Sequence, residues 1–252
     1  MGNILAIGGG ETFEENRILN TEIISLSKKK NPKILFIPTA SCDAEEYWKK
    51  FDIEFRNKLK CKTNVLCLIN DKPKKEEITD KILGSDIIYV GGGSTLSMMK
   101  LWRKFKVDEI LTRAYRKGIV MSGLSAGGIC WFKYGLSDSR RIKNPKADLI
   151  KVNALNFISA AYCPHYDSSK AKKDIDWDRK IQLKKMMKKN NDVALAFDNN
   201  CAIEIINRKF RIIASRKSAN AYKIYWKNGR FYKNKIKKLK ELKSIDSLII
   251  KN

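Results

Sequence analysis

Short apolar runs alternate along the first half of the chain with longer segments in which apolar residues recur at helical spacing. Each short run ends at glycine, proline or a polar cluster, as expected of strands buried on both faces. The runs predicted to form strands are 3–7, 33–38, 64–68, 86–90 and 118–122. The segments predicted to form helices are 12–28, 43–58, 77–83, 96–105 and 107–116. This alternation predicts an α/β fold with a doubly wound, mostly parallel sheet flanked by helices.

The loops that follow the predicted strands are the expected place for a ligand site. In doubly wound sheets, ligands bind beyond the carboxyl ends of the strands. We therefore expect the loops after Ile7, Pro38, Val90 and Ser122 to share one rim.

The second half of the chain continues with shorter elements. A helix is predicted at 174–189, and the predicted strands are 192–197, 202–206, 210–215 and 221–226. Tight turns between these strands favour antiparallel additions at a sheet edge. Because no linker or internal repeat divides the sequence, we expect one hydrolytic domain over 1–252.

Composition narrows the class of protein. The chain has 252 residues, of which 43% are hydrophobic, enough for a core without disulfides. Its six cysteines form no C-x-x-C pair, which favours reduced thiols and a cytoplasmic location. No apolar stretch approaches the roughly 20 residues of a membrane span, so we expect no membrane association.

The net charge of +25 is concentrated toward the C-terminus, where 208–252 carries fifteen Lys and Arg against two acidic residues. Such a segment could bind nucleic acid or another anion. A lysine-rich solvated surface is the simpler interpretation. Nucleic acid is therefore not the expected partner, although a basic binding protein on a modified hydrolase scaffold stays as the alternative function.

The main chemical signal is a G-x-S-x-G pattern, GLSAGG at 123–128, which follows an apolar strand and precedes a helical run. A nucleophile elbow needs small neighbours because its turn is tight and the serine backbone is strained. Ser125 is therefore the predicted nucleophile. A structural glycine-rich turn is the alternative.

The chain contains a single histidine, His165. A serine nucleophile needs a base with a pKa near 7, and only this side chain can supply an imidazole. His165 is accordingly the predicted base. The acid that orients it is predicted to be Asp138, with Asp167 and Asp198 as alternatives.

Three consecutive glycines, 91–93, also follow an apolar strand. Their exposed amides could cradle a phosphate, but the spacing and lysine of a P-loop are missing. We expect an oxyanion hole instead, formed by an amide of Gly92 or Gly93 together with that of Ala126. The polar residues that follow, Ser94 and Thr95, are predicted to contact substrate.

In this order and spacing, VGGGST at 90–95, GLSAGG at 123–128 and CPHYD at 163–167 resemble the dipeptidase E family of serine peptidases, which has a class I glutamine amidotransferase-like fold. The resemblance extends over about 4–206. It implies the same nucleophile, base, oxyanion amides and acid as above. It also implies small peptide substrates, including dipeptides that begin with aspartate.

Basic side chains that could bind such a carboxylate are Arg140, Arg141 and Arg179, although a general surface role is the simpler interpretation for each. We predict a serine peptidase that uses no cofactor and no metal and acts as a monomer or homodimer. An α/β-hydrolase esterase would share the elbow, but its histidine usually lies nearer the end of the chain. An amidotransferase would need a cysteine at position 125, which is serine here.

Overall fold

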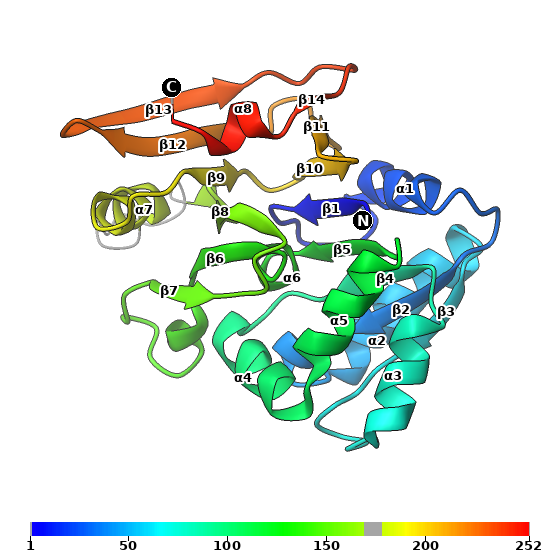
Figure 1. Cartoon of the computed structure of the whole chain (residues 1–252). Helices are drawn as coiled ribbons and strands as arrows, with labels where there is room; N and C mark the ends of the chain where they lie inside the picture. The colour runs from blue at the N-terminus through cyan, green and yellow to red at the C-terminus, as the bar shows by residue number, and fades with distance from the viewer. Residues whose placement is uncertain (1, 169–177, 252) are drawn as a thin grey trace.

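The structure is a computed structural model that describes residues 2–168 and 178–251. Its strands form two sheets (Figure 1). The eight-stranded sheet has the order β14-β11-β10-β1-β5-β4-β2-β3, and the six-stranded sheet has the order β13-β12-β9-β8-β6-β7.

The first sheet has a parallel centre made of the five strands expected from the first half of the sequence. These are β1 (Ile4–Ile7), β2 (Lys33–Ile37), β3 (Lys62–Val65), β4 (Ile87–Val90) and β5 (Val120–Leu124). Antiparallel strands extend it beyond β1, namely β10 (Cys201–Ile206), β11 (Lys209–Ala214) and β14 (Lys243–Ser244). The predicted α/β class is confirmed.

Helices cover both faces of this sheet. One face packs against α3 (Lys75–Leu83), α4 (Thr95–Phe105), α5 (Val107–Arg116) and the short α6 (Ala126–Ile129). The other packs against α1 (Arg17–Leu26), α2 (Glu45–Asp52) and the π-helix η2 (Ile53–Lys58). On that second face the aromatic rings of Phe13, Phe36, Tyr47, Phe51, Phe55 and Tyr89 form one contiguous cluster. The close packing of these rings holds the neighbouring strand ends in place.

The second sheet was not anticipated as a separate unit. It contains β6 (Phe132–Ser137), β7 (Ile150–Asn153), β8 (Ile158–Cys163), β9 (Ala194–Phe197), β12 (Ala221–Lys227) and β13 (Arg230–Ile236). The run 129–132, predicted to be helical, leaves α6 and enters β6, because buried Phe132 and Tyr134 alternate with exposed Lys133 at the period of a strand. Strand β9 pairs antiparallel with β12, as expected, and parallel with β8, which was not among the predicted strands.

The remaining short helices are η1 (Thr39–Ser41), η3 (Ser139–Ile142), α7 (Arg179–Lys188) and α8 (Asp246–Ile249). The helix predicted at 174–189 is present from Arg179, and 174–177 lies outside the described residues. In the part of the chain that the structure describes, no helix has the length and apolar character needed to span a bilayer.

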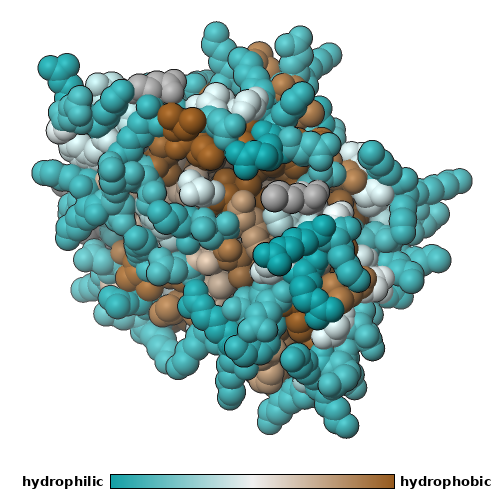
Figure 2. Space-filling view, in the orientation of Figure 1, coloured by the Kyte–Doolittle hydropathy of each residue, from teal (hydrophilic) through white to brown (hydrophobic). Residues whose placement is uncertain are grey.

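The basic C-terminal segment is part of both sheets. Its strands β11 and β14 pair within the first sheet, and β12 and β13 pair within the second. The ammonium group of buried Lys223 donates to the carbonyls of Ser247 and Ile250, at 2.8 and 2.6 Å, and so anchors the region around α8. Hydrophilic side chains cover most of the face shown in Figure 2. The positive charge therefore lies on folded structure.

Candidate active site

Ser125 occupies a sharp turn between β5 and α6. Its backbone has φ 57° and ψ −110°, a conformation that a non-glycine residue adopts only when its surroundings enforce it. The enforcing contact is the approach of the two glycines in the motif. A Cβ on Gly123 would lie 2.4 Å from the carbonyl oxygen of Gly127, and one on Gly127 would lie 2.0 Å from that of Val90. The predicted elbow is therefore present in the backbone.

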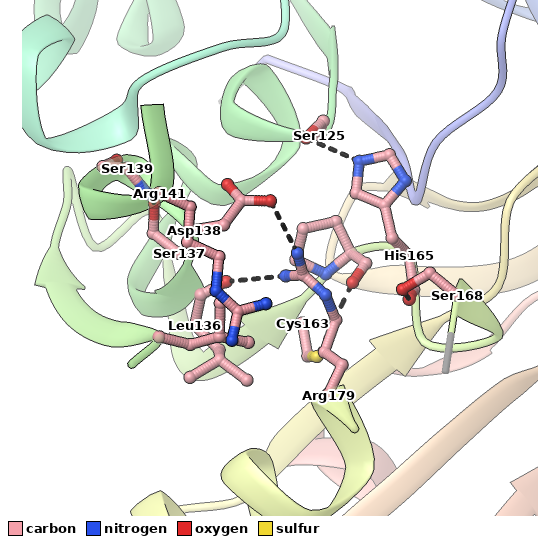
Figure 3. A network of polar contacts seen from close by, with 12 residues as sticks. Ser125, Leu136, Ser137, Asp138, Ser139, Arg141, Cys163, His165, Ser168 and Arg179 are labelled. Atoms are coloured by element: carbon pink, nitrogen blue, oxygen red, sulfur yellow. Dashed lines mark hydrogen bonds and ion pairs between the residues drawn. The ribbon is translucent and has the colours of Figure 1, made fainter. Parts of the chain in front are cut away.

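His165 follows β8 and reaches across to the turn. Its Nε2 lies 2.8 Å from Ser125 Oγ (Figure 3). The backbone amide of His165 donates to the carbonyl of Gly8 at 2.9 Å. The ring rests against bare backbone, since a Cβ on Gly9 would lie 2.3 Å from His165 Nδ1. The glycine-rich turn after β1 thus has a specific use, which is to let the imidazole approach the first sheet.

The other ring nitrogen is held by an amide side chain. Asn199 Oδ1 lies 2.6 Å from His165 Nδ1. With an oxygen facing it, Nδ1 carries the proton and Nε2 is left to accept from the serine hydroxyl. Asp167 supports this arrangement from behind, because its carboxylate accepts from the Asn199 backbone amide at 3.0 Å. Both ring nitrogens therefore have their partners.

Asp138, predicted to orient the imidazole, is bonded elsewhere. Its carboxylate pairs with Arg179 at 2.8 Å, a contact drawn in Figure 3. Asp198, an alternative acid, accepts from the backbone amide of Asn220 at 2.9 Å. The structure thus differs from the predicted triad, since Asn199 takes the position at Nδ1. Sequence reasoning missed Asn199 because only acids were considered, although it comes just after a buried strand whose carboxyl end lies at the site.

The surroundings favour the neutral imidazole. Burial is the main cause that lowers the pKa of His165 from its usual 6.5, and the positive charge of Arg179 lowers it further. The hydrogen bond with Asn199 and the charges of Asp138 and Asp167 act in the opposite direction and only partly offset this. A neutral ring at pH 7 is the form that can accept a proton.

The predicted oxyanion amides lie beside Ser125 but are not equally available. A Cβ on Gly92 would lie 3.5 Å from the Cβ of Ser125, so the glycine loop borders the nucleophile. However, the Gly92 amide already donates to the hydroxyl of Tyr47 at 3.1 Å. Ala126 is the first residue of α6, and the amide of a first helical residue has no acceptor within its helix. The amide of Gly93 belongs to the same loop, which a φ of 132° bends toward Ala40.

The predicted substrate-binding residues lie at the start of α4 or are arginines. Ser94 and Thr95 begin α4 and are buried, and the Ser94 hydroxyl caps that helix by accepting from the Ser97 amide at 3.2 Å. Arg179 is only 6% exposed and also donates to the carbonyl of Leu136 at 3.3 Å. Arg140 is exposed, and Arg141 donates to the carbonyl of Ala147 at 2.7 Å.

A metal site was not predicted for this chain. Within residues 2–168 and 178–251, no group of three or more His, Cys, Asp or Glu side chains is placed to hold a metal ion.

Comparison with known proteins also indicates a peptidase. The sequence profile described as Peptidase family S51 matches residues 4–213. The uncharacterized peptidase YgaJ of Bacillus subtilis (strain 168) is 34% identical over 227 residues, which cover 89% of this chain and 92% of that protein.

Two solved structures share the fold. A peptidase from an acI-B1 Actinobacterium superposes with a TM-score of 0.73 at 16% identity and covers 97% of each chain. A putative peptidase E protein from Listeria monocytogenes EGD-e superposes with a TM-score of 0.63 at 21% identity, over 85% of this chain and 98% of that one. At these identities the likeness concerns the fold alone.

Proposed function

The chain belongs to peptidase family S51 and is a serine-type peptidase, and we propose that it hydrolyses small peptides through Ser125, His165 and Asn199. The observation that carries this proposal is the 2.8 Å contact between Ser125 Oγ and His165 Nε2 at a strained turn. A hydroxyl in that position has its general base within hydrogen-bonding distance. The imidazole is the only one in the chain.

Acylation follows from these contacts. Ser125 Oγ attacks the peptide carbonyl carbon while its proton passes to His165 Nε2, and the carbonyl π electrons move to the oxygen. The amides of Ala126 and Gly93 are proposed to donate to that oxygen, because the Gly92 amide is engaged by Tyr47. The C–N bond then breaks as His165 returns the proton to the leaving amine.

Deacylation repeats the sequence with water. His165 Nε2 takes a proton from the water molecule, whose oxygen attacks the acyl-enzyme carbonyl carbon. The C–Oγ bond of the second tetrahedral intermediate then breaks as His165 returns the proton to Ser125 Oγ, which restores the hydroxyl and releases the carboxylic acid.

Asn199 has a defined part in this scheme. Its oxygen fixes the tautomer and direction of the ring, as a carboxylate does in a Ser-His-Asp triad. Being neutral, it cannot balance the charge of the imidazolium that forms during the reaction. Asp138 and Asp167 supply negative charge at longer range, since both raise the pKa of His165.

The proposed substrates include peptides with N-terminal aspartate. We place this acyl residue of the peptide on the side of Arg179. Arg179 is buried near the imidazole and is the basic group whose charge acts on it most strongly. A guanidinium can bind two carboxylates through different edges of its fork. One terminal nitrogen donates to Asp138 and the other to the carbonyl of Leu136, so the acidic side chain of the substrate would accept from the remaining N–H bonds of this guanidinium.

Covalent labelling and a peptide panel test the proposal together. A fluorophosphonate probe is expected to label the native protein and to leave the Ser125→Ala variant unlabelled, with both showing the same thermal midpoint. Dipeptides with N-terminal aspartate, alanine and lysine then test the acyl preference. Labelling without hydrolysis of any peptide would show that the nucleophile is active but that peptides are not its substrates.

A further inference from the structure

A cavity of about 750 Å³ opens on the side of the first sheet that faces α1 and α2. Its lining comes from the turn after β1, from α2 and η2, and from the residue before the nucleophile. Its lining includes Phe13, Tyr47, Ile53, Lys58 and Leu124. The volume is that of a typical small-ligand pocket.

Three lining residues connect the cavity to the catalytic centre, two along the chain and one through a hydrogen bond. Leu124 lines it and directly precedes Ser125. Gly10 also lines it and follows Gly9, against which the imidazole rests. Tyr47 lines it as well, and its hydroxyl accepts from the amide of the glycine loop. The cavity therefore adjoins the chain neighbours of Ser125 and of the glycine on which the imidazole rests, and Tyr47 connects it to the oxyanion loop.

The walls are apolar at the base and charged at the rim. Phe13 stacks on Tyr47 with ring centroids 5.4 Å apart, and Leu124 packs in the same hydrophobic cluster. At the rim, Arg17 is held by Glu54 through two hydrogen bonds of 2.9 Å, so this guanidinium is committed to a partner. The remaining lining charges are of both signs and favour neither a cationic nor an anionic occupant.

The π-helix η2 shapes one side of this cavity. A π-helical turn closes through i→i+5 hydrogen bonds, which brings residues five apart to the same side. Ile53 and Lys58 are such a pair, and both line the cavity. Ile53 is 53% exposed even though it is a large apolar residue. An apolar side chain left uncovered at the mouth of a pocket is well suited to contact a ligand.

We propose that this cavity receives the leaving residue of the peptide and selects for a bulky apolar or aromatic side chain there. The inference rests on the proposed peptidase function. If the acyl residue lies toward Arg179 and the second sheet, the scissile nitrogen and the residue that follows it point the other way, toward Leu124. The side chain of that residue then packs against Phe13, Leu124 and Ile53.

The test compares substrates that differ only in the leaving residue. With the same N-terminal residue throughout, kcat/KM is expected to be about tenfold or more higher for a dipeptide ending in phenylalanine than for one ending in alanine. The Ile53→Trp variant narrows the mouth and is expected to lower kcat/KM for the phenylalanine peptide by about tenfold, while the alanine peptide changes by less than about twofold. Ile250→Trp is the matched control, because Ile250 is 59% exposed and does not line the cavity.

Labelling of Ser125 by a small fluorophosphonate distinguishes failure of the cavity assignment from failure of the proposed peptidase function. Its rate is expected to be the same in the native protein, Ile53→Trp and Ile250→Trp, since the probe does not need the cavity. Peptide hydrolysis that is indifferent to the leaving residue and to Ile53→Trp would overturn the assignment of the cavity and leave the peptidase function standing. Absence of any peptide hydrolysis, with labelling intact, would overturn both.

Discussion

Asn199 Oδ1 lies 2.6 Å from His165 Nδ1, so a neutral amide occupies the position where a serine hydrolase triad usually has a carboxylate. The amide can orient the ring but brings no charge to it. Orientation and charge stabilisation can therefore be separated in this site by changing one side chain.

The Asn199→Asp variant adds the missing charge. The carboxylate favours the imidazolium, so the pKa of His165 rises and the acidic limb of the kcat/KM profile moves to higher pH. Asn199→Ala removes the orienting contact instead, and kcat is expected to fall by about 10²-fold or more. Kinetic pH profiles of both variants give the measurement, and a kcat of Asn199→Ala within twofold of native would refute the orienting role.

Asn200→Ala is the control for these two variants. Asn200 donates to Asn16 Oδ1 at 3.2 Å and does not bond the imidazole. Its removal is expected to lower the thermal midpoint while the acidic limb of the profile stays where it is in the native protein.

The charge of Arg179 leads to a second prediction, about the pH dependence of kcat/KM. Burial and then the Arg179 charge lower the pKa of His165 in the folded state, so activity is expected to persist below pH 6.5. Arg179→Gln removes that charge, the pKa rises, and the acidic limb moves to higher pH. The exposed Arg140→Gln is the control and is expected to leave the limb in place. An unchanged limb in Arg179→Gln would show that its charge does not act on the imidazole.

The same pKa shift affects folding stability. Because the folded-state pKa of His165 lies below its unfolded value, the unfolded chain binds a proton first as the pH falls. The His165 contribution to the free energy of unfolding is therefore lost as pH falls through about 6.5 and below. Urea titrations at pH 7.5 and 5.5 on native protein and His165→Gln would measure the difference, which the variant should lack.

Two tyrosines of one aromatic cluster offer a matched pair. The Tyr47 hydroxyl accepts from the Gly92 amide, whereas the buried Tyr89 hydroxyl has no hydrogen-bond partner among the described residues. Tyr47→Phe is expected to lower stability by about 1 kcal/mol and to reduce kcat by loosening the glycine loop. Tyr89→Phe removes a buried polar group without a partner and should raise stability or leave it unchanged. Thermal denaturation and kcat distinguish the two.

The C-terminal end is expected to be needed for folding. Truncation after Ser244 removes the carbonyl acceptors of the buried Lys223 ammonium and the buried Leu248 side chain. A large drop in thermal midpoint is expected, because the buried ammonium loses these two acceptors and the apolar contacts of Leu248 are lost with them. Adding Lys223→Met to the truncated chain should restore part of the lost thermal midpoint. Equal midpoints for the full-length and truncated chains would contradict this role.

The sequence predicted the first sheet well because its strands are short, apolar and separated by strongly periodic helices. The helix at 107–116 was predicted with the bounds that α5 has. The second sheet was harder to predict, since β6 begins inside a run that was expected to be helical and the later strands were expected as additions to the edge of one sheet. No local pattern states which sheet a strand joins.

The site residues also divide into those that a local sequence pattern reveals and those that it does not. Ser125 and its glycines are recognisable because the strained turn constrains its own neighbours in sequence. The orienting partner of His165 depends on which strand end lies beside it, and Asn199 and Asp138 both follow strands that end near the imidazole. Only the three-dimensional arrangement places Asn199 at Nδ1 and turns Asp138 toward Arg179.

That a chain of 252 residues contains one histidine gives the site its own spectroscopic reporter. In a proton NMR spectrum, the Cε1–H resonance of an imidazole moves with its protonation, and here it needs no assignment among competing rings. Every change at this centre, from a variant to an inhibitor to a bound peptide, can be followed through one isolated signal.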